Sequence, residues 1–165
     1  MISKTDLKSR WPEIKKLFRR AFNSSFHYSI ASVTAEGTPH VTPIGSLILL
    51  DDLKGFYFEI FTKNLPTNLK TNQRVCVMAV DDGFWFWLRS LIAGRYSRPV
   101  GFRLYGTVGE RRVATPEEIG QFHKRVRHLS FLKGYKLLWK TLHDVRDIQF
   151  DSFEEVFIGP MMKKF

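Results

Sequence analysis

The spacing of apolar residues changes along the chain, and each spacing predicts an element. Residues 4–22 place their apolar side chains at helical intervals. We therefore expect an N-terminal helix that is capped by Thr5 or Asp6 and packs on a sheet. Pro12 lies inside this stretch and is expected to kink the helix or to begin a second one.

Alternating runs of β-branched and aromatic residues predict the strands. Residues 28–34 and 39–50 are expected to form a hairpin around Gly37, whose turn requires a positive φ. Pro43 and Gly45 interrupt the second strand, which we therefore expect to be irregular or at an edge, because proline lacks the ladder N–H and glycine permits a bulge. Further strands are expected over residues 56–61, 74–80, 101–113, 145–150 and 154–158.

Four consecutive aromatic residues, Phe84–Trp87, follow a turn at 81–83. We expect them in a strand, which would place two rings on each face of the sheet. Two interpretations stay open, namely packing in the core and burial between two copies of the chain. A basic loop with Arg89, Arg95 and Arg98 is expected to follow.

The C-terminal third begins with a strong helix start. Thr115 is a suitable N-cap, Pro116 suits the first helical position, and Glu118 completes a capping box. A second helix is expected from about residue 131 to 142. Gly106, in the strand before these helices, is expected to mark a bend or a close contact. About six strands joined by tight turns predict a closed or split β-barrel rather than a parallel sheet.

The composition is that of a folded domain. The chain has 165 residues, of which 44% are hydrophobic and 15% aromatic, so it can bury a core and is not of the disordered class. The absence of a long apolar run argues against a membrane-spanning helix. The single cysteine, Cys76, and an N-terminus without a secretory-type apolar segment favour a cytoplasmic location. The net charge of +10 is dispersed, as on a solvated surface.

The candidate ligand-binding stretch is residues 55–80, which reads as strand, polar turn, short helix and strand. Thr62, Lys63 and Asn64 bring hydroxyl, ammonium and amide groups to a helix N-terminus, an arrangement that can bind an anion. An ordinary turn with a solvated lysine is the alternative. No metal, dinucleotide, phosphate-loop or nucleophile motif is found. His40 is the histidine of most interest, with an ordinary strand histidine as its alternative.

Taken in order, these segments resemble the pyridoxamine 5′-phosphate oxidase-like, FMN-binding split-barrel proteins. The match covers about residues 28–113 and is carried by residues 31–39, 41–47, Thr62, Lys63 and 68–75 (NLKTNQRV). The resemblance implies one domain over all 165 residues, built as a six-stranded antiparallel split β-barrel, mainly β with flanking helices. The barrel would span about 26–113 and 145–159, and the helices 4–22 and 115–142.

The resemblance also implies a homodimer with FMN bound across its interface. By position, Thr62 and Lys63 would hold the FMN phosphate, and the irregular strand over residues 41–45 would offer backbone groups to the isoalloxazine ring and ribityl chain. The residues thus assigned to the cofactor are Thr42, Pro43, Ile44, Thr62, Lys63, Asn64 and Asn68.

The chain departs from this family at Leu65 and Pro66, where members often carry basic residues, and it lacks a C-terminal basic pair for pyridoxine phosphate. We therefore expect an FMN-dependent oxidoreductase of unidentified small-molecule substrate and electron donor, without pyridoxamine phosphate oxidase activity. Alternatives are a deazaflavin-dependent reductase and a haem-binding or haem-degrading protein with His40 or another histidine as axial ligand. A nucleic-acid binder is the least favoured, because the charge is dispersed.

Overall fold

The computed structural model describes residues 4–60, 62–131, 133–134 and 142–162. Four α-helices, one 3₁₀-helix and seven strands are found in this part of the chain. In order they are α1 (Lys4–Ser25), β1 (Tyr28–Val33), β2 (Pro39–Ile44), β3 (Ile48–Leu49), β4 (Lys54–Phe58), α2 (Asn64–Leu69), β5 (Arg74–Val80), α3 (Phe84–Ala93), β6 (Gly101–Val113), α4 (Pro116–Val126), η1 (Arg127–Leu129) and β7 (Asp144–Glu155).

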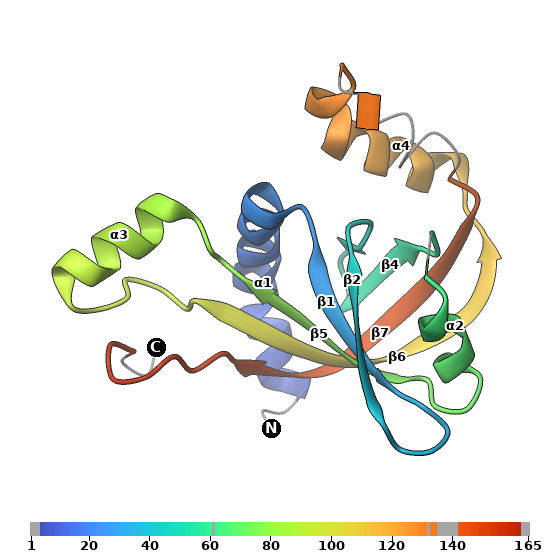
Figure 1. The fold of residues 1–165 in the computed structure, drawn as a ribbon, viewed down its shortest axis with the longest axis horizontal. Helices are drawn as coiled ribbons and strands as arrows, with labels where there is room; N and C mark the ends of the chain where they lie inside the picture. Colours follow the sequence, from blue (N-terminus) through green and yellow to red (C-terminus); the bar gives the residue numbers. More distant parts are fainter. Residues whose placement is uncertain (1–3, 61, 132, 135–141, 163–165) are drawn as a thin grey trace.

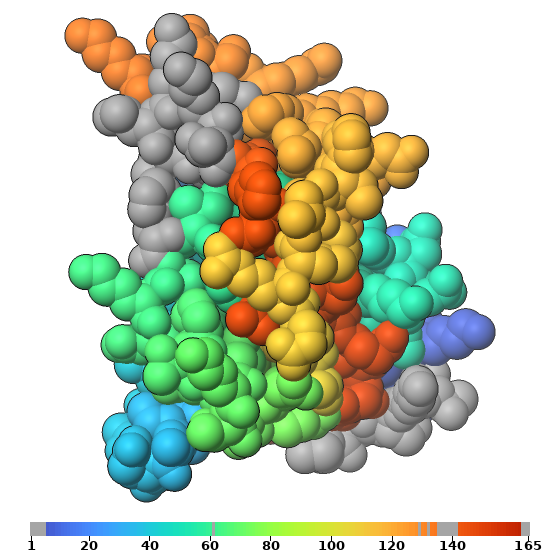
Figure 2. Space-filling view, turned by 90° about the vertical axis from the view of Figure 1, so that its right-hand side faces the viewer, coloured from blue at the N-terminus to red at the C-terminus, as the bar shows by residue number. Residues whose placement is uncertain are grey.

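The strands form one antiparallel sheet in the order β2-β1-β5-β6-β7-β4-β3 (Figure 1). The two longest strands, β6 and β7, lie side by side at the surface, with α4 at one end and α2 at the other (Figure 2). The edge strands β2 and β3 follow each other in the chain, but no described ladder joins them. The predicted mainly β split barrel with flanking helices is confirmed, with seven strands rather than six.

The N-terminal helix is the main cover of the sheet. It packs on β1, β5, β6 and β7 and is assigned as a single helix through Pro12, so the suggestion of a second helix beginning there is wrong. The indole N–H of Trp11 donates to the Leu50 carbonyl at 2.8 Å, which ties the helix to the segment after β3. The buried apolar face of α1 comprises Leu7, Trp11, Ile14, Leu17, Phe18, Ala21 and Phe22.

Two strand predictions differ from the structure in their bounds. The expected strand 39–50 is two strands, β2 and β3, and the break between them agrees with the predicted irregularity. The two expected C-terminal strands are instead one strand, β7. Its register opposite β6 shifts at Asp151, because Tyr105 pairs with Ser152 and Gly106 with Phe150. One extra residue is thus absorbed as a bulge, so the polar residues there do not end the strand.

The aromatic run is a helix rather than a strand. α3 begins after Gly83 and ends at Gly94, whose φ of 63° is left-handed. Phe86 and Ser90, four residues apart, form its buried face, whereas Trp85 is exposed. Apolar residues with high β-propensity suggested a strand, but the two glycines and the four-residue spacing of the buried positions decide for a helix.

The helix start at Thr115 is confirmed as a capping box. The Thr115 hydroxyl accepts from the Glu118 amide at 3.2 Å, and the Glu118 carboxylate accepts from the Thr115 amide at 2.8 Å. Most of the second helix expected over residues 131–142 lies outside the described residues. Within the described ranges, no helix has the length and apolar character needed to cross a bilayer.

The close contact expected at Gly106 is confirmed and yields a prediction. A Cβ at this position would lie 2.5 Å from the backbone oxygen of Gln149, whereas one at Gly109 would meet nothing nearer than 3.7 Å. Gly106→Ala should lower the free energy of unfolding by about 1–3 kcal/mol, the usual range for overpacking. Gly109→Ala should change it by less than about 1 kcal/mol. Urea unfolding of both variants measures the difference, and equal midpoints would contradict the close contact.

Candidate functional site

The outer edge of β2 is open, and its two prolines keep it poor in donors. The Thr34 amide donates to the Thr38 carbonyl at 2.9 Å, which makes this a hydrogen-bonded pair. Because such pairs alternate in an antiparallel ladder, His40, Thr42 and Ile44 bond to β1 in turn. Pro39, Val41 and Pro43 therefore face outward, so this edge offers their three carbonyls and one N–H.

A polar pocket of about 300 Å³ lies at the first half of β2. The side chain of Asn64, the first residue of α2, reaches the ring of His40 at 3.1 Å and so joins the helix to the strand. The walls combine hydroxyl, amide and imidazole groups with one carboxylate. The lining residues are Thr34, Ala35, Glu36, His40, Asn64, Thr67, Asn68 and Thr71.

Both ring nitrogens of His40 are already engaged. Its Nε2 is 3.1 Å from the Asn64 amide nitrogen and its Nδ1 is 3.3 Å from the Thr42 hydroxyl. The Asn64 amide donates, so Nε2 accepts and Nδ1 carries the proton. In this structure His40 therefore links β2 to α2, and its Nε2, the atom that an axial haem ligand would use, faces the Asn64 amide.

Asn68 is buried beneath the pocket and holds α2 on β1. Its amide donates to the Ser32 hydroxyl at 2.9 Å, and both residues are buried. Ser32 was not among the expected site residues. A sequence signal did exist, because Ser32 follows Tyr28 and Ile30 on the inward face of β1, where a hydroxyl requires a partner.

Thr62 and Lys63 lie between β4 and α2, beside this pocket. The Ser46 hydroxyl, just beyond β2, donates to the Phe58 carbonyl at 2.9 Å and accepts from the Phe58 amide at 3.1 Å. This bond fixes the end of β4 near the end of β2. The Thr62 hydroxyl is buried without a hydrogen-bond partner among the described residues. The neighbouring Lys63 side chain is exposed and makes no described ion pair.

The dipole of α2, which was expected to favour an anion at this turn, is weak. α2 has only six residues and no side-chain N-cap bond, and the effect of a helix dipole grows with aligned peptide units. At the pocket wall, a hydrogen bond from Thr34 lowers the pKa of the Glu36 carboxyl, so Glu36 is ionised at neutral pH. A phosphate would be disfavoured beside Glu36 and better placed toward Lys63.

The expected strand contacts divide into three kinds. The Thr42 side chain shares the inward side of β2 with His40 and is half-buried. The Pro43 side chain is exposed, and its carbonyl faces the open edge. Ile44 is 5% exposed and belongs to the core, and its N–H points toward β1. A ligand along the open edge would therefore meet the Pro43 backbone but not the Ile44 amide.

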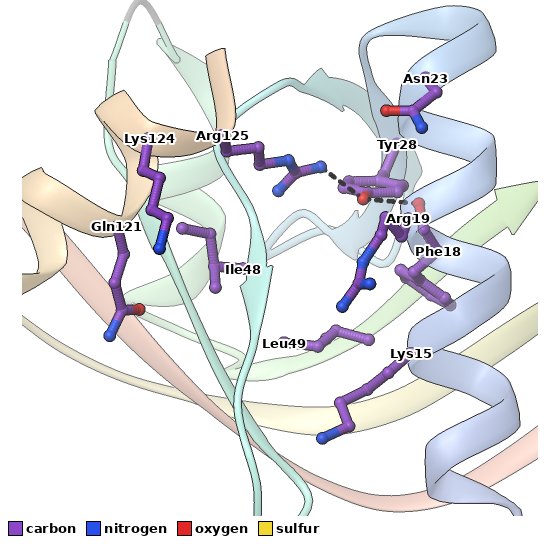
Figure 3. A pocket seen from close by; sticks show the side chains of 10 residues that line it. All are labelled: Lys15, Phe18, Arg19, Asn23, Tyr28, Ile48, Leu49, Gln121, Lys124 and Arg125. Atoms are coloured by element: carbon purple, nitrogen blue, oxygen red, sulfur yellow. Dashed lines mark hydrogen bonds between the residues drawn. The ribbon is translucent and has the colours of Figure 1, made fainter. Parts of the chain in front are cut away.

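A second pocket, of about 460 Å³, lies at the other end of β2 (Figure 3). Tyr28, which pairs with Ile44 across β1 and β2, marks the connection. Cationic side chains from α1 and α4 face one another across Ile48 and Leu49. Within the described part of the chain no carboxylate lines this pocket, whose residues are Lys15, Phe18, Arg19, Asn23, Tyr28, Ile48, Leu49, Gln121, Lys124 and Arg125.

The fixed charge of this basic pocket is Arg125. Its guanidinium donates to the Tyr28 hydroxyl at 2.6 Å and to the Leu47 carbonyl, and it lies 3.5 Å from the centre of the Phe22 ring. Burial lowers the pKa of Arg125, and the nearby charge of Arg19 acts in the same direction. Arg125 has no described carboxylate partner, so the pocket carries uncompensated positive charge that an anion would offset.

α1 also contributes two cations to this pocket, and no carboxylate among the described lining residues accompanies them. Lys15 and Arg19 are four residues apart and line one wall, a like-charge spacing that destabilises an isolated helix. Lys15 pairs with Asp51 at 2.5 Å, but the Asp51 side chain is 88% exposed and lies outside the lining. Among the described residues, neither Arg19 nor Lys124 has an acidic partner, so both remain available to a ligand.

Many solved structures share this fold, and three of them illustrate the similarity. The FMN-binding protein of Syntrophomonas wolfei has a TM-score of 0.60 and 15% identity, over 93% of this chain and 97% of its own. HupZ of Group A Streptococcus has a TM-score of 0.57 and 20% identity, over 88% and 92%. An F420 reductase has a TM-score of 0.53 and 16% identity, over 85% and 94%. At these identities the similarity establishes the fold alone.

Sequence comparison establishes the family. No curated protein sequence matches the chain. The family model described as pyridoxamine 5′-phosphate oxidase matches residues 14–149. This match runs from the middle of α1 into β7 and includes β2, the Thr62–Lys63 turn and both pockets. The chain therefore belongs to the pyridoxamine 5′-phosphate oxidase family.

Proposed function

We propose that this protein binds FMN beside β2 and acts as a flavin-dependent oxidoreductase. The buried Thr62 hydroxyl, which has no hydrogen-bond partner among the described residues, carries the proposal, because such a donor is costly unless a ligand satisfies it. Lys63 supplies a positive charge next to that hydroxyl. The similarity to the FMN-binding protein of S. wolfei supports the choice of cofactor.

The chain offers three environments for three parts of the cofactor. Thr62 and Lys63 suit the phosphate, as a hydrogen bond and a charge-assisted bond. The polar pocket at His40 and Asn64 suits the ribityl hydroxyls. The open edge of β2 suits the polar rim of the ring. Bound FMN would supply the electron or hydride transfer, while these residues hold and orient it.

A second copy of the chain fits this arrangement. Val41 is 61% exposed at the centre of the open edge, between two exposed prolines. A flat ring placed there would be covered on one side only. We therefore include a homodimer in the proposal, with the partner closing the cofactor site. Because the fold is shared with an F420 reductase, a deazaflavin is the alternative cofactor, and the absorption spectrum of the loaded protein separates the two.

We further propose that the basic pocket receives an anionic group of the substrate. It adjoins the end of β2 that carries Ile44, whereas the polar pocket adjoins His40. Ile44 lies four positions after His40 along the strand, a distance of about 13 Å. The uncompensated charges of Arg19, Lys124 and Arg125 favour a phosphate or carboxylate over a neutral group.

Thr62→Val should separate stability from binding. Without ligand, removal of the unpartnered hydroxyl should leave the free energy of unfolding unchanged or raise it by up to about 1 kcal/mol. The affinity of the Thr62→Val variant for FMN should be lower than that of the unmodified protein. Thr71→Val is the matched control, because the Thr71 hydroxyl donates to the Asn68 carbonyl at 3.0 Å and its loss should destabilise the protein by about 1 kcal/mol. Urea unfolding checks both variants, and equal destabilisation would mean that Thr62 is partnered in the free protein.

Lys63→Ala should weaken FMN binding about tenfold, equivalent to about 1.4 kcal/mol, and should leave riboflavin binding unchanged. The reason is that only FMN carries the phosphate that Lys63 would contact. Lys70→Ala removes an exposed lysine from the far end of α2 and should change neither affinity. Fluorescence titration with FMN and with riboflavin measures these affinities for the cofactor-free unmodified protein and for both variants. Equal loss for both flavins would place the phosphate elsewhere, and no binding by the unmodified protein would reject the cofactor.

The basic pocket can be tested without a known substrate. Phenyl phosphate should bind the protein and phenol should not, because the pocket selects the anion. Arg19→Gln or Lys124→Gln should each weaken phenyl phosphate binding about fivefold to tenfold. Lys8→Gln, an exposed lysine elsewhere on α1, should leave it unchanged. Isothermal titration calorimetry measures these affinities, and a similar loss in all three variants would indicate non-specific attraction.

A further inference from the structure

α3 exposes an unusual amount of apolar surface. The exposed fractions of Phe84, Trp85, Leu91 and Ile92 are 69%, 69%, 62% and 79%. These residues occupy the outward side of a ten-residue helix whose other side carries Phe86 and Ser90. The helix lies at one end of the molecule, far from α4 (Figure 1). A soluble chain seldom leaves several large side chains exposed on one helix unless a partner covers them.

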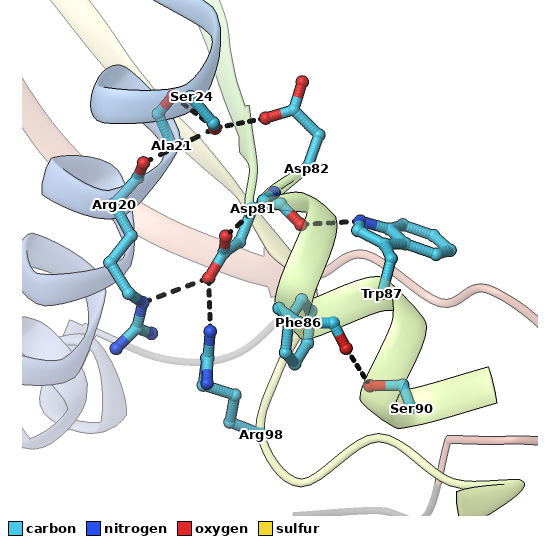
Figure 4. Close-up of polar contacts among 10 residues, drawn as sticks. Arg20, Ala21, Ser24, Asp81, Asp82, Phe86, Trp87, Ser90 and Arg98 are labelled. Atoms are coloured by element: carbon cyan, nitrogen blue, oxygen red, sulfur yellow. Dashed lines mark hydrogen bonds and ion pairs between the residues drawn. The ribbon is translucent and has the colours of Figure 1, made fainter. Parts of the chain in front are cut away.

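The outward face of α3 is held in place and cannot simply turn inward. The indole N–H of Trp87 donates to the Asp81 carbonyl at 2.9 Å (Figure 4). The buried Asp81 carboxylate pairs with Arg20 of α1 at 3.1 Å and with Arg98 at 2.8 Å. These bonds attach both the start of α3 and the loop behind it to the main body. The apolar face is therefore presented on a fixed support.

A pocket of about 420 Å³ with three arginines adjoins this face. Arg89 and Arg95 contribute the uncompensated charge, whereas Arg98 pairs with Asp81, and no carboxylate of the described residues lines the pocket. The Nε–H of Arg98 is buried without a hydrogen-bond partner among the described residues. Between Gly83 and Gly109 the sequence contains no Asp or Glu. The remaining lining residues are Trp85, Phe86, Ser90, Ala93 and Ser97.

The charge pattern identifies the kind of occupant. A second copy docked through a two-fold axis would meet the same patch on its partner, so Arg89 and Arg95 would face the same two arginines, which have no acidic partner among the described residues. A single-stranded nucleic acid would use the rings for stacking, yet the most exposed of the large apolar side chains on α3 is the aliphatic Ile92. A bilayer with anionic headgroups over an apolar interior matches both features, because its phosphates suit the arginine pocket and its interior suits Ile92.

We propose that α3 and the arginine pocket form a docking surface for an anionic phospholipid bilayer. Phe84, Trp85 and Ile92 enter the interfacial layer, where tryptophan is favoured. The arginines beside them bind the phosphates of the headgroups. The contact is peripheral and involves one face of α3. It is independent of the flavin site, which lies around β2 and α2.

The test is co-sedimentation of the full chain with vesicles. The protein should bind phosphatidylcholine vesicles containing 30% phosphatidylglycerol at least tenfold more tightly than phosphatidylcholine alone. Ile92→Ser should weaken this binding about tenfold, and Arg89→Gln about fivefold. The matched controls are Phe131→Ser, which replaces a residue that is 81% exposed elsewhere, and Arg127→Gln on η1. Both controls should bind as the unmodified protein does.

Four outcomes would overturn the proposal. The first is no preference for the anionic vesicles. The second is an equal effect of Ile92→Ser and Phe131→Ser, which would mean that α3 has no special part. The third is that Ile92→Ser changes the oligomeric state in sedimentation equilibrium. The fourth is that a single-stranded oligonucleotide binds α3 more tightly than the vesicles do. Circular dichroism of each variant confirms that the fold is retained.

Discussion

The open edge of β2 is the constraint on which the site depends. Pro39 and Pro43 cannot donate to another strand, and the pairing of Thr34 with Thr38 places both of them on the outer side. The sheet therefore stops at β2 and does not close onto β3. Ser46 then bonds to Phe58 in place of a ladder. The same irregularity exposes carbonyls, ends the strand and brings the Thr62 turn beside it.

Local signals in the sequence predicted most of the fold. The irregularity at Pro43 and Gly45, the capping box at Thr115 and the close contact at Gly106 each depend on a few neighbouring residues, and each was confirmed. By contrast, the bulge at Asp151, which keeps β7 a single strand, depends on pairing with Tyr105 and Gly106 of β6, about 45 residues earlier in the chain. The aromatic run at Phe84–Trp87 was misassigned because side-chain preference for strands is weaker than tertiary context.

In the candidate site, too, features set by neighbouring residues could be predicted, whereas contacts between remote residues could not. Thr62, Lys63, Asn64 and Asn68 are close in sequence, and their neighbourhood could be predicted from the resemblance. The partners that define their environment are remote: Asn68 bonds to Ser32, and Asn64 to His40. The basic pocket was missed because Arg125 meets Tyr28 from a helix ninety-seven residues away. Only the four-residue spacing of Lys15 and Arg19 hinted at it.

The net charge of +10 looks dispersed along the sequence but is organised in space. On β6 and β7, arginines such as Arg112 and Arg146 pair with carboxylates and stabilise the sheet. In the basic pocket and beside α3, arginines converge without acidic residues lining the cavity. Like charges brought together in this way raise the free energy of the folded chain unless an anion is present. Arg19, Lys124 and Arg125 in the basic pocket, and Arg89 and Arg95 beside α3, have no acidic partner among the described residues. This lack of compensation is why we propose that both groups bind anionic ligands.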